Sequence, residues 1–322
     1  MGAQVFNLGN RGISYTNTLS VHQDRRGIPF LDFASAYLAK CRKSIHAKRA
    51  YKNSLDHFIK FCTLNDLSPM TYEIGMEVME DFVYYMQADA KLMSSTVAGH
   101  LVHFKTLLKM ASFSGYDVDF TYSDVNIRED EIDVVTLDRD EITQIYCFDR
   151  LTKSEEQIRD LFILGCSTGL RYSDCSRLTE KNFIDNKIQI KTKKTGTLVI
   201  IPQSKYVRNI LRKYDYQSPA NICIQYFNKV IKEVCRKVGI NQFIPYERTI
   251  GTERISVMVE KWKRITSHTG RRSAATNMFL SGIPALRIMM ITGHKTEAAF
   301  MRYIGLTKEE NAATLAGNMF FH

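Results

Sequence analysis

The stretch Ser267-His268-Thr269-Gly270-Arg271-Arg272 decides how this chain of 322 residues is interpreted. His268 and Arg271 are three positions apart, so a helix would carry both on one face. Ser267 or Thr269 would cap such a helix and place the two side chains near its positive N-terminal end. An imidazole and a guanidinium there suit two oxygens of a phosphate, although a basic helix start without a ligand has the same pattern.

A second block, Gly169-Leu170-Arg171-Tyr172-Ser173-Asp174, follows a break between two apolar helical patterns. We therefore expect Arg171 near the start of a helix, where backbone N–H groups also attract anions. Asp174 lies one turn further on and would hold the guanidinium of Arg171 in place. The ordinary alternative is an exposed Arg–Asp pair that contributes little to stability.

A third block, Gly293-His294, ends the apolar run of residues 283–291. Pro284 suits the first position of a helix over this run, and glycine suits its C-terminal end. We expect Thr296 to cap the next helix, which places Tyr303 two turns into it. Taken alone, Tyr303 would be assigned to a hydrophobic core, because its neighbours in that helix are apolar.

Two β-rich runs, residues 187–192 and 197–201, flank a turn with a glycine at 196 and predict a β-hairpin. The turn carries two adjacent lysines, Lys193 and Lys194.

The rest of the chain is predicted to be mainly α-helical. Residues 1–28 are polar and contain several glycines, so we expect a flexible leader. Residues 29–115 have apolar side chains at helical spacing and predict a bundle of four or five helices. Residues 116–137 are acidic and predict an extended linker. Residues 138–322 predict a mostly helical domain with one small sheet, starting at an N-cap formed by Asp138 and an acid three residues later.

The net charge of +10 is unevenly distributed. Residues 161–322 contain 26 Lys and Arg against 11 Asp and Glu, whereas residues 116–160 contain 5 against 14. A basic domain of this kind indicates a polyanionic partner, most often nucleic acid.

The segment from Lys40 to Lys60 is also basic, and as a helix it would present cations to a phosphate backbone or simply to solvent. Its candidate DNA-binding residues are Lys43, Lys48, Arg49 and Lys52.

Other classes of protein fit the sequence poorly. No apolar run reaches 18 residues, which argues against a membrane span, and the N-terminus has no secretory pattern. We therefore expect an intracellular protein. The seven cysteines form no C-x-x-C pair, so we expect no metal site.

The order of the blocks is more specific than any one of them. R-x-x-D, a hairpin lysine, H-x-x-R, G-H and a tyrosine nine residues after that histidine resemble the tyrosine recombinase (phage integrase) family in order and spacing. The resemblance covers roughly residues 30–322 and implies a SAM-like, helical core-binding domain ahead of a catalytic domain. The blocks at 267–272 and 291–295 most resemble integrases of Bacteroides-type mobile elements.

The resemblance implies that Tyr303 attacks the scissile phosphate, forms a 3′-phosphotyrosyl bond and releases a 5′-hydroxyl, without metal, ATP or other cofactor. Arg171 and Arg271 would neutralise charge on the non-bridging oxygens through forked hydrogen bonds. His268 and His294 would donate hydrogen bonds to the phosphate, and His268 would help to accept the tyrosine proton.

A hairpin lysine would protonate the leaving 5′-oxygen. Lys194 is the first choice because it directly precedes the Thr195-Gly196 turn, and Lys193 is the alternative. Asp174 would orient the groups that contact the phosphate.

The partners implied are double-stranded DNA, further copies of the chain in a tetramer, and accessory DNA-bending proteins, at the nucleoid of a bacterial cytoplasm. The apolar tail, residues 306–322, would dock on a neighbouring protomer. Only about 28 residues precede the bundle, so either the protein has two domains or an arm-binding domain has been removed.

Two other functions use the same fold. A type IB topoisomerase shares the chemistry, but the separate helical domain and the apolar tail favour recombination. A catalytically silent DNA-binding regulator is disfavoured by the complete set of six candidate catalytic residues.

Overall fold

The computed structural model describes residues 25–127, 134–306, 312 and 316. The chain forms two compact units, one of Met1–Asp130 with Thr249–Arg254 and one of Glu131–Arg248 with Ile255–His322. The expected leader lies almost wholly outside the described residues, and so does most of the apolar tail.

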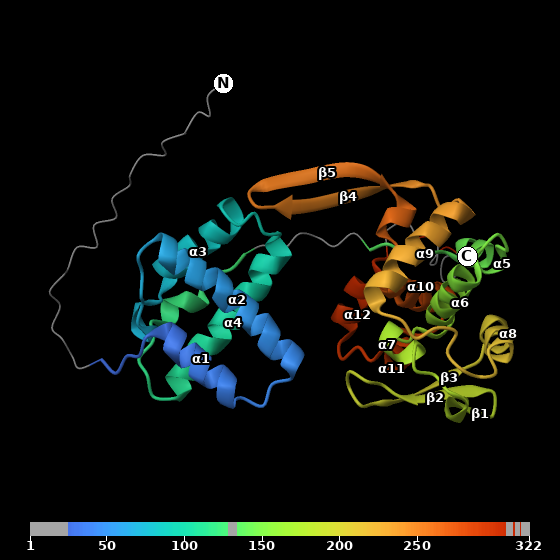
Figure 1. Ribbon diagram of the computed structural model, residues 1–322, viewed down its shortest axis with the longest axis horizontal. Helices are drawn as coiled ribbons and strands as arrows, with labels where there is room; N and C mark the ends of the chain where they lie inside the picture. Colours follow the sequence, from blue (N-terminus) through green and yellow to red (C-terminus); the bar gives the residue numbers. More distant parts are fainter. Residues whose placement is uncertain (1–24, 128–133, 307–311, 313–315, 317–322) are drawn as a thin grey trace, which may run out of the picture. The chain divides into compact units, whose positions relative to one another are not determined.

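The first unit is a helical bundle, as its apolar spacing predicts (Figure 1). Its elements are α1 (Phe30–Lys40), α2 (Ile45–Leu64), η1 (Thr71–Glu73), α3 (Met76–Ala88), α4 (Ser94–Phe113) and η2 (Phe120–Ser123). Four fully buried phenylalanines, one from each of α1 to α4, meet at its centre. Phe58 lies with its ring centroid 4.9 Å from that of Phe104 and 5.0 Å from that of Phe82. Packing of large aromatic rings of this kind dominates the stability of a small core.

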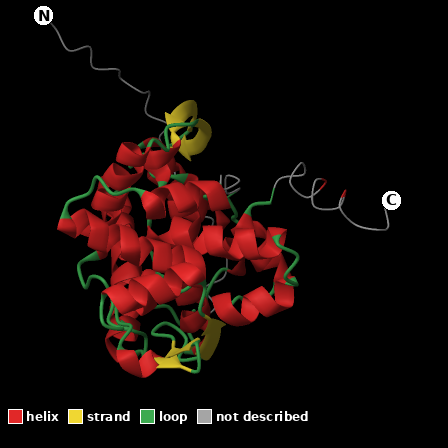
Figure 2. Ribbon diagram, turned by 90° about the vertical axis from the view of Figure 1, so that its right-hand side faces the viewer, coloured by secondary structure: helices red, strands yellow, loops and turns green. Residues whose placement is uncertain are grey.

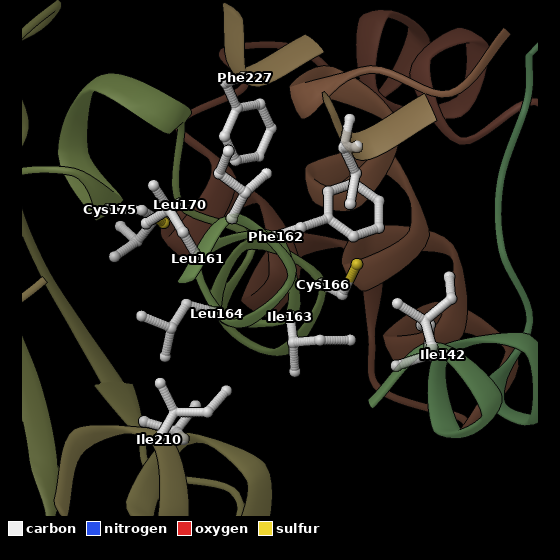
Figure 3. Packing of buried hydrophobic residues seen from close by; sticks show 14 of the residues in the cluster. Ile142, Leu161, Phe162, Ile163, Leu164, Cys166, Leu170, Cys175, Ile210 and Phe227 are labelled. Atoms are coloured by element: carbon white, nitrogen blue, oxygen red, sulfur yellow. The ribbon is translucent and has the colours of Figure 1, made fainter. Parts of the chain in front are cut away.

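The second unit is built around one helix, α6 (Lys153–Thr168), which is buried on every side from Ile158 to Cys166. The helices that pack on it are α5 (Arg139–Cys147), α8 (Lys205–Lys213), α9 (Ile224–Val238) and α10 (Ser267–Leu280). Figure 3 shows the α6 side chains among Ile142, Ile210 and Phe227 from three of these neighbours. A helix buried all round needs apolar residues on all faces, which the part from Leu161 to Cys166 supplies, whereas the buried Arg159 and Asp160 form an ion pair with each other.

The ends of these helices follow the sequence signals closely. The predicted N-cap of α5 is confirmed, because Asp138 Oδ1 accepts from the N–H of Glu141 at 2.8 Å and Glu141 Oε2 accepts from the N–H of Asp138 at 3.0 Å. Helix α6 ends at Gly169, whose φ of 69° is a left-handed conformation that glycine adopts without strain.

The predicted β-hairpin is confirmed and is one edge of a three-stranded antiparallel sheet with the order β1-β2-β3. Its strands are β1 (Phe183–Ile184), β2 (Lys187–Lys191) and β3 (Leu198–Pro202). Ile188 pairs with Ile201 and Ile190 with Val199, and these four side chains form its buried face.

The expectation of a single small sheet is wrong. A second hairpin of β4 (Phe243–Ile250) and β5 (Glu253–Glu260) lies between α9 and the short helix η4 (Lys261–Arg264). None of its residues outside the turn is fully buried, so neither strand has a face that packs into a core. Figure 2 shows that helices nevertheless predominate, which agrees with the predicted mainly α fold.

The last elements surround a small core of their own, made by Ala275 of α10, Ile288 and Met289 of α11 (Ala285–Thr292), and Phe300 and Ile304 of α12 (Glu297–Ile304). Thr296 caps α12, as predicted, by accepting from the N–H of Ala299.

Two predicted helix starts differ by one residue from the structure. Pro284 precedes α11 instead of occupying its first position. The N-cap of α10 is Thr266, not Ser267, and the side chain of Thr269 accepts a hydrogen bond from the backbone N–H of Thr266 at 3.0 Å. No helix in the described part of the chain combines the length and the apolar character needed to cross a membrane.

A buried polar cluster joins α2 to α4 in the first unit. The hydroxyl of Ser54 lies 2.7 Å from Nδ1 of His100 and 2.7 Å from Nδ1 of His103, and the ring of His57 lies 5.1 Å from that of His100. Burial, together with the charges of the other two histidines, lowers the pKa of His100 to about 4. The cluster is therefore neutral at pH 7.

We expect this cluster to make the fold sensitive to acid. The unfolded chain binds a proton at His100 near pH 6.5 and the folded protein only near pH 4, so stability is complete above pH 6.5 and falls as the pH drops toward 4. Between pH 7 and pH 5 the free energy of unfolding should fall by about 2 kcal/mol more in the wild type than in His100→Gln. Urea denaturation at both pH values measures this, with exposed His46→Gln as the matched control. Equal pH dependence in wild type and His100→Gln would contradict the prediction.

Candidate active site

Arg271 is the best-anchored residue of the predicted site. Its side chain is buried, with Nη1 donating to the carbonyl oxygen of Gly169 at 2.6 Å and Nη2 donating to the carbonyl oxygen of Thr292. These two carbonyls lie at the C-terminal ends of α6 and α11, where the aligned peptide dipoles are negative and favour a cation. The guanidinium on α10 thus joins the end of the following helix, α11, to the end of α6, which is distant in the sequence.

The hydroxyl of Tyr303, on α12, is buried and has no hydrogen-bond partner in the described part of the chain. Burial raises the pKa of Tyr303, while the charges of Arg271, Arg272 and Arg171 act to lower it. Tyr303 is therefore a neutral phenol at pH 7. Its oxygen makes no hydrogen bond of ordinary geometry with a described residue, but the nearby Arg271 guanidinium lowers its pKa as a hydrogen-bond donor as well as through its charge.

Two imidazoles flank the Tyr303 ring. The His268 ring is 5.4 Å from it, nearly perpendicular, and the His294 ring is 4.5 Å from it. Withdrawal from solvent and then the neighbouring arginines lower the pKa of each histidine to about 4. Both rings are accordingly neutral at pH 7, and each keeps one nitrogen able to accept a proton.

A hydrogen bond fixes the tautomer of His294. Its Nδ1 lies 2.8 Å from the hydroxyl of Thr292, which donates its only hydrogen to the carbonyl oxygen of Ile288 at 3.0 Å. Nδ1 must then carry the proton and Nε2 must be the free acceptor.

Arg171 completes this group. It is the half-buried N-cap residue of the one-turn helix α7 (Tyr172–Cys175), close to its predicted position at a helix start. Its charge lowers the pKa of His268, His294 and Tyr303. The structure thus brings together five of the six predicted catalytic residues.

The expected pairing of Asp174 with Arg171 is wrong. Asp174 is fully buried, and its Oδ1 accepts from Nη2 of Arg177 at 2.9 Å and from the backbone N–H of Lys193 at 2.8 Å. Its Oδ2 has no partner within the described chain. Asp174 therefore connects α7 to the β2–β3 turn, a contact that the i, i+3 spacing to Arg171 could not reveal.

The lysines of that turn lie on its exposed side. The turn is closed by a hydrogen bond from the N–H of Thr192 to the carbonyl oxygen of Thr197, and Gly196 has a φ of 68°. Neither Lys193 nor Lys194 makes a side-chain hydrogen bond or ion pair with another described residue. The structure does not bring either ammonium group to the other five residues.

Arg272 is a residue of this site that the sequence did not single out. Its guanidinium carbon lies 5.3 Å from the centroid of the Tyr303 ring. Its position four residues after His268 on the same helix face was a usable signal.

The basic segment of the first unit is not one helix, because α1 ends at Lys40 and α2 begins at Ile45. The predicted DNA-binding residues Lys48, Arg49 and Lys52 lie in the first turns of α2. Lys43 precedes α2 and lies 4.9 Å from the ring centroid of Tyr51. Among the described residues, no three His, Cys, Asp or Glu side chains converge as metal ligands would.

Solved structures share this fold. The lambda integrase (residues 75–356) dimer bound to a COC′ core site aligns with a TM-score of 0.67 at 14% identity, over 86% of this chain and 95% of that one. The lambda integrase tetramer bound to a Holliday junction gives 0.62 at 14%, over 83% and 77%. The Tn1549 transposon integrase in complex with transposon right end DNA gives 0.64 at 13%, over 89% and 98%.

The sequence itself matches two family descriptions. Residues 29–126 match the phage integrase SAM-like domain, and residues 135–310 match the phage integrase family. A comparison with curated proteins finds no match. The second of these regions alone covers more than half of the 322 residues of the chain. The chain therefore belongs to the phage integrase family and is a tyrosine-type site-specific recombinase.

Proposed function

We propose that this recombinase cleaves and rejoins DNA through Tyr303. The observation that carries the proposal is the phenol oxygen of Tyr303, which is buried and makes no hydrogen bond of ordinary geometry with a described residue. The guanidinium of Arg271 lies near enough to act on it, and Arg171 and two neutral imidazoles are close by. A buried hydroxyl without a partner is unfavourable, so such a group indicates a ligand that completes it. Cations of this kind suit a phosphodiester.

In the proposed reaction, the Tyr303 oxygen attacks the scissile phosphorus as the bond from phosphorus to the 5′-oxygen breaks. The DNA 3′-phosphate becomes linked to Tyr303, and the 5′-oxygen leaves as a hydroxyl after taking up a proton. A 5′-hydroxyl from the other duplex then attacks the phosphotyrosine and restores the diester. One phosphate ester replaces another at each step, so neither ATP nor a metal is required.

Arg271 and Arg171 would stabilise the charge that builds on the non-bridging oxygens. Arg271 is suited to this because its two carbonyl contacts hold the guanidinium rigidly before DNA arrives.

The two histidines would act differently from the first expectation. Since Nε2 of neutral His294 is an acceptor, it can donate to a phosphate only after it is protonated. The negative phosphate would raise the pKa of both histidines and so favour transfer of the Tyr303 proton to one of them. His268, whose ring centroid lies 5.4 Å from that of Tyr303, is retained as the proposed acceptor because the family resemblance implies it.

For the leaving group we retain Lys194 as the proposed acid, with Lys193 as the alternative. Asp174 is proposed to act through the turn: by holding the N–H of Lys193, it limits where both ammonium groups can reach.

We further propose that double-stranded DNA is contacted by both units, with Lys43, Lys48, Arg49 and Lys52 meeting phosphates. A tetramer is proposed because the structurally similar lambda integrase has been solved as a tetramer bound to a Holliday junction. In this tetramer, the tail after Leu306 would dock on a neighbouring protomer.

The proposed biological setting is a Bacteroides-type mobile element. The recombinase would act at the nucleoid together with accessory DNA-bending proteins.

The nucleophile can be tested with a nicked suicide duplex, which loses the leaving strand after cleavage and traps the adduct. The duplex should carry a site that the protein selects from a randomised DNA library. Wild type should form a covalent protein–DNA adduct, whereas Tyr303→Phe should bind the same DNA and form none, because it lacks the attacking oxygen. Denaturing gel electrophoresis measures the adduct.

Tyr206→Phe, which removes a hydroxyl bonded to Thr143 in the same unit, is the matched control and should form the adduct normally. A chelator should leave the rate unchanged. An adduct that persists in Tyr303→Phe would refute the assignment, and loss of cleavage with chelator would indicate a metal-dependent nuclease.

The acid can be identified by changing Lys193 and Lys194 separately to Met. Loss of the true acid should slow cleavage about a hundredfold with a normal 5′-oxygen. It should have little effect on a 5′-phosphorothiolate substrate, because a thiolate leaves without a proton. Single-turnover rates on both substrates measure this. A defect that the sulfur substrate rescues in Lys193→Met and not in Lys194→Met would reverse our assignment.

The role of Asp174 predicts a local change in dynamics. Asp174→Ala removes the acceptor of the Lys193 N–H, so exchange of that amide should accelerate about tenfold or more. Hydrogen exchange of the peptide covering residues 188–199 measures this. Arg177→Met, which removes the other partner of the same oxygen, should leave the Lys193 amide protected. Unchanged protection in Asp174→Ala would show that the carboxylate does not hold the turn.

A further inference from the structure

Arg272 lies in the site with no acceptor for its buried Nε among the described residues. Its Nε is buried and has no hydrogen-bond partner, and within the described residues the guanidinium makes no hydrogen bond or ion pair. Its close contact is the face of the Tyr303 ring, 5.3 Å from the guanidinium carbon. The preceding residue of α10, Arg271, by contrast donates to two carbonyl oxygens.

An unpaired, half-buried guanidinium is unfavourable, because it has lost water without gaining an acceptor. A neutral aromatic face offsets only part of that loss. Arg264 opposes the arrangement further, since its charge acts to lower the pKa of Arg272. A negative charge that forms beside the Arg272 guanidinium would offset this cost, because it would supply the missing acceptor.

Two sources could supply that charge, the phenolate of Tyr303 or a phosphate oxygen of DNA. The geometry favours the phenolate. The guanidinium lies over the ring, and the negative charge of a phenolate spreads into its ring. Arg272 also follows Arg271 as the strongest of the charges that lower the pKa of Tyr303.

The same side chain acts on the proposed proton acceptor. Arg272 is the first of the charges that lower the pKa of His268, one helical turn before it. The other charged or titratable groups that face Tyr303 are Arg171 from α7, Arg271 from α10, and His294 from the junction of α11 and α12.

We propose that Arg272 is a positioning residue for the nucleophile, which holds the Tyr303 ring against α10 and stabilises its phenolate as the proton leaves. This inference rests on the proposed role of Tyr303 as nucleophile. Arg271 and Arg171 then serve the phosphate, while Arg272 serves the tyrosine.

The interaction can be measured without DNA. The full chain is prepared with 3-fluorotyrosine, whose phenol is more acidic than that of tyrosine, and the Tyr303 fluorine signal is assigned by its loss in Tyr303→Phe. Titration by fluorine NMR then gives the pKa of this one phenol. Arg272→Met should raise it by about one unit, whereas Arg272→Lys, which keeps the charge, should leave it much closer to the wild-type value.

Arg302→Met is the matched control, because Arg302 is adjacent to Tyr303 in sequence but exposed, and it should not change the titration. Arg272→Gln provides a second neutral variant in case Arg272→Met does not fold. A Tyr303 pKa that is the same in wild type and in either folded neutral variant would overturn the proposal.

Cleavage of the nicked duplex separates the two sources of negative charge. Arg272→Met should form the adduct about tenfold more slowly at pH 7, with a deficit that shrinks as the pH rises, and should bind DNA with unchanged affinity and salt dependence. Weaker, less salt-dependent binding with an unchanged fluorine titration would assign Arg272 to a phosphate and overturn the proposal. If the fluorine shift is found but wild type forms no adduct, the proposed function fails while the Arg272–Tyr303 interaction stands.

Discussion

The candidate active site depends on one buried cation, the guanidinium of Arg271, which donates hydrogen bonds to the ends of two helices. Arg271 donates to the carbonyl oxygens of Gly169 and Thr292, which belong to segments more than a hundred residues apart. Both helices end at a glycine in the left-handed conformation, Gly169 and Gly293, and such ends leave carbonyls free to accept. The contact that stabilises the second unit therefore also fixes a guanidinium beside Tyr303 before any phosphate is present.

The electrostatic state around that cation explains how the site can remain inactive without substrate. Burial and the arginine charges keep His268 and His294 neutral, and burial keeps Tyr303 protonated. Among these groups, no negative charge is present to raise the pKa of the two histidines. A phosphodiester would supply it, raising the pKa of the imidazoles while the arginines favour the phenolate, so that substrate binding and proton transfer are coupled. In the proposed mechanism, binding of the phosphate would itself prepare Tyr303 as the nucleophile.

The sequence predicted those parts that depend on local signals. Asp138, Gly169, Gly293 and Thr296 mark helix ends through backbone chemistry that neighbouring residues determine, and the spacing of the blocks predicted which side chains converge. It failed where a partner is distant in sequence or a face is not buried. The carboxylate of Asp174 accepts a hydrogen bond from a backbone N–H nineteen positions away in the sequence. The β4–β5 hairpin is half-exposed and has no buried face. The sequence did not identify Arg272 because its contact, the ring of Tyr303, lies on another helix.

The most direct measurement is to find which residue carries the DNA. The covalent adduct formed on the nicked duplex can be digested with nuclease and protease and its peptides sequenced by mass spectrometry. The structure predicts a nucleotide on the peptide that contains Tyr303, the tyrosine whose hydroxyl is buried beside Arg271. A nucleotide on any other residue, such as Tyr172 or Ser173 near Arg171, would show that the nucleophile and the geometry built around it have been assigned wrongly.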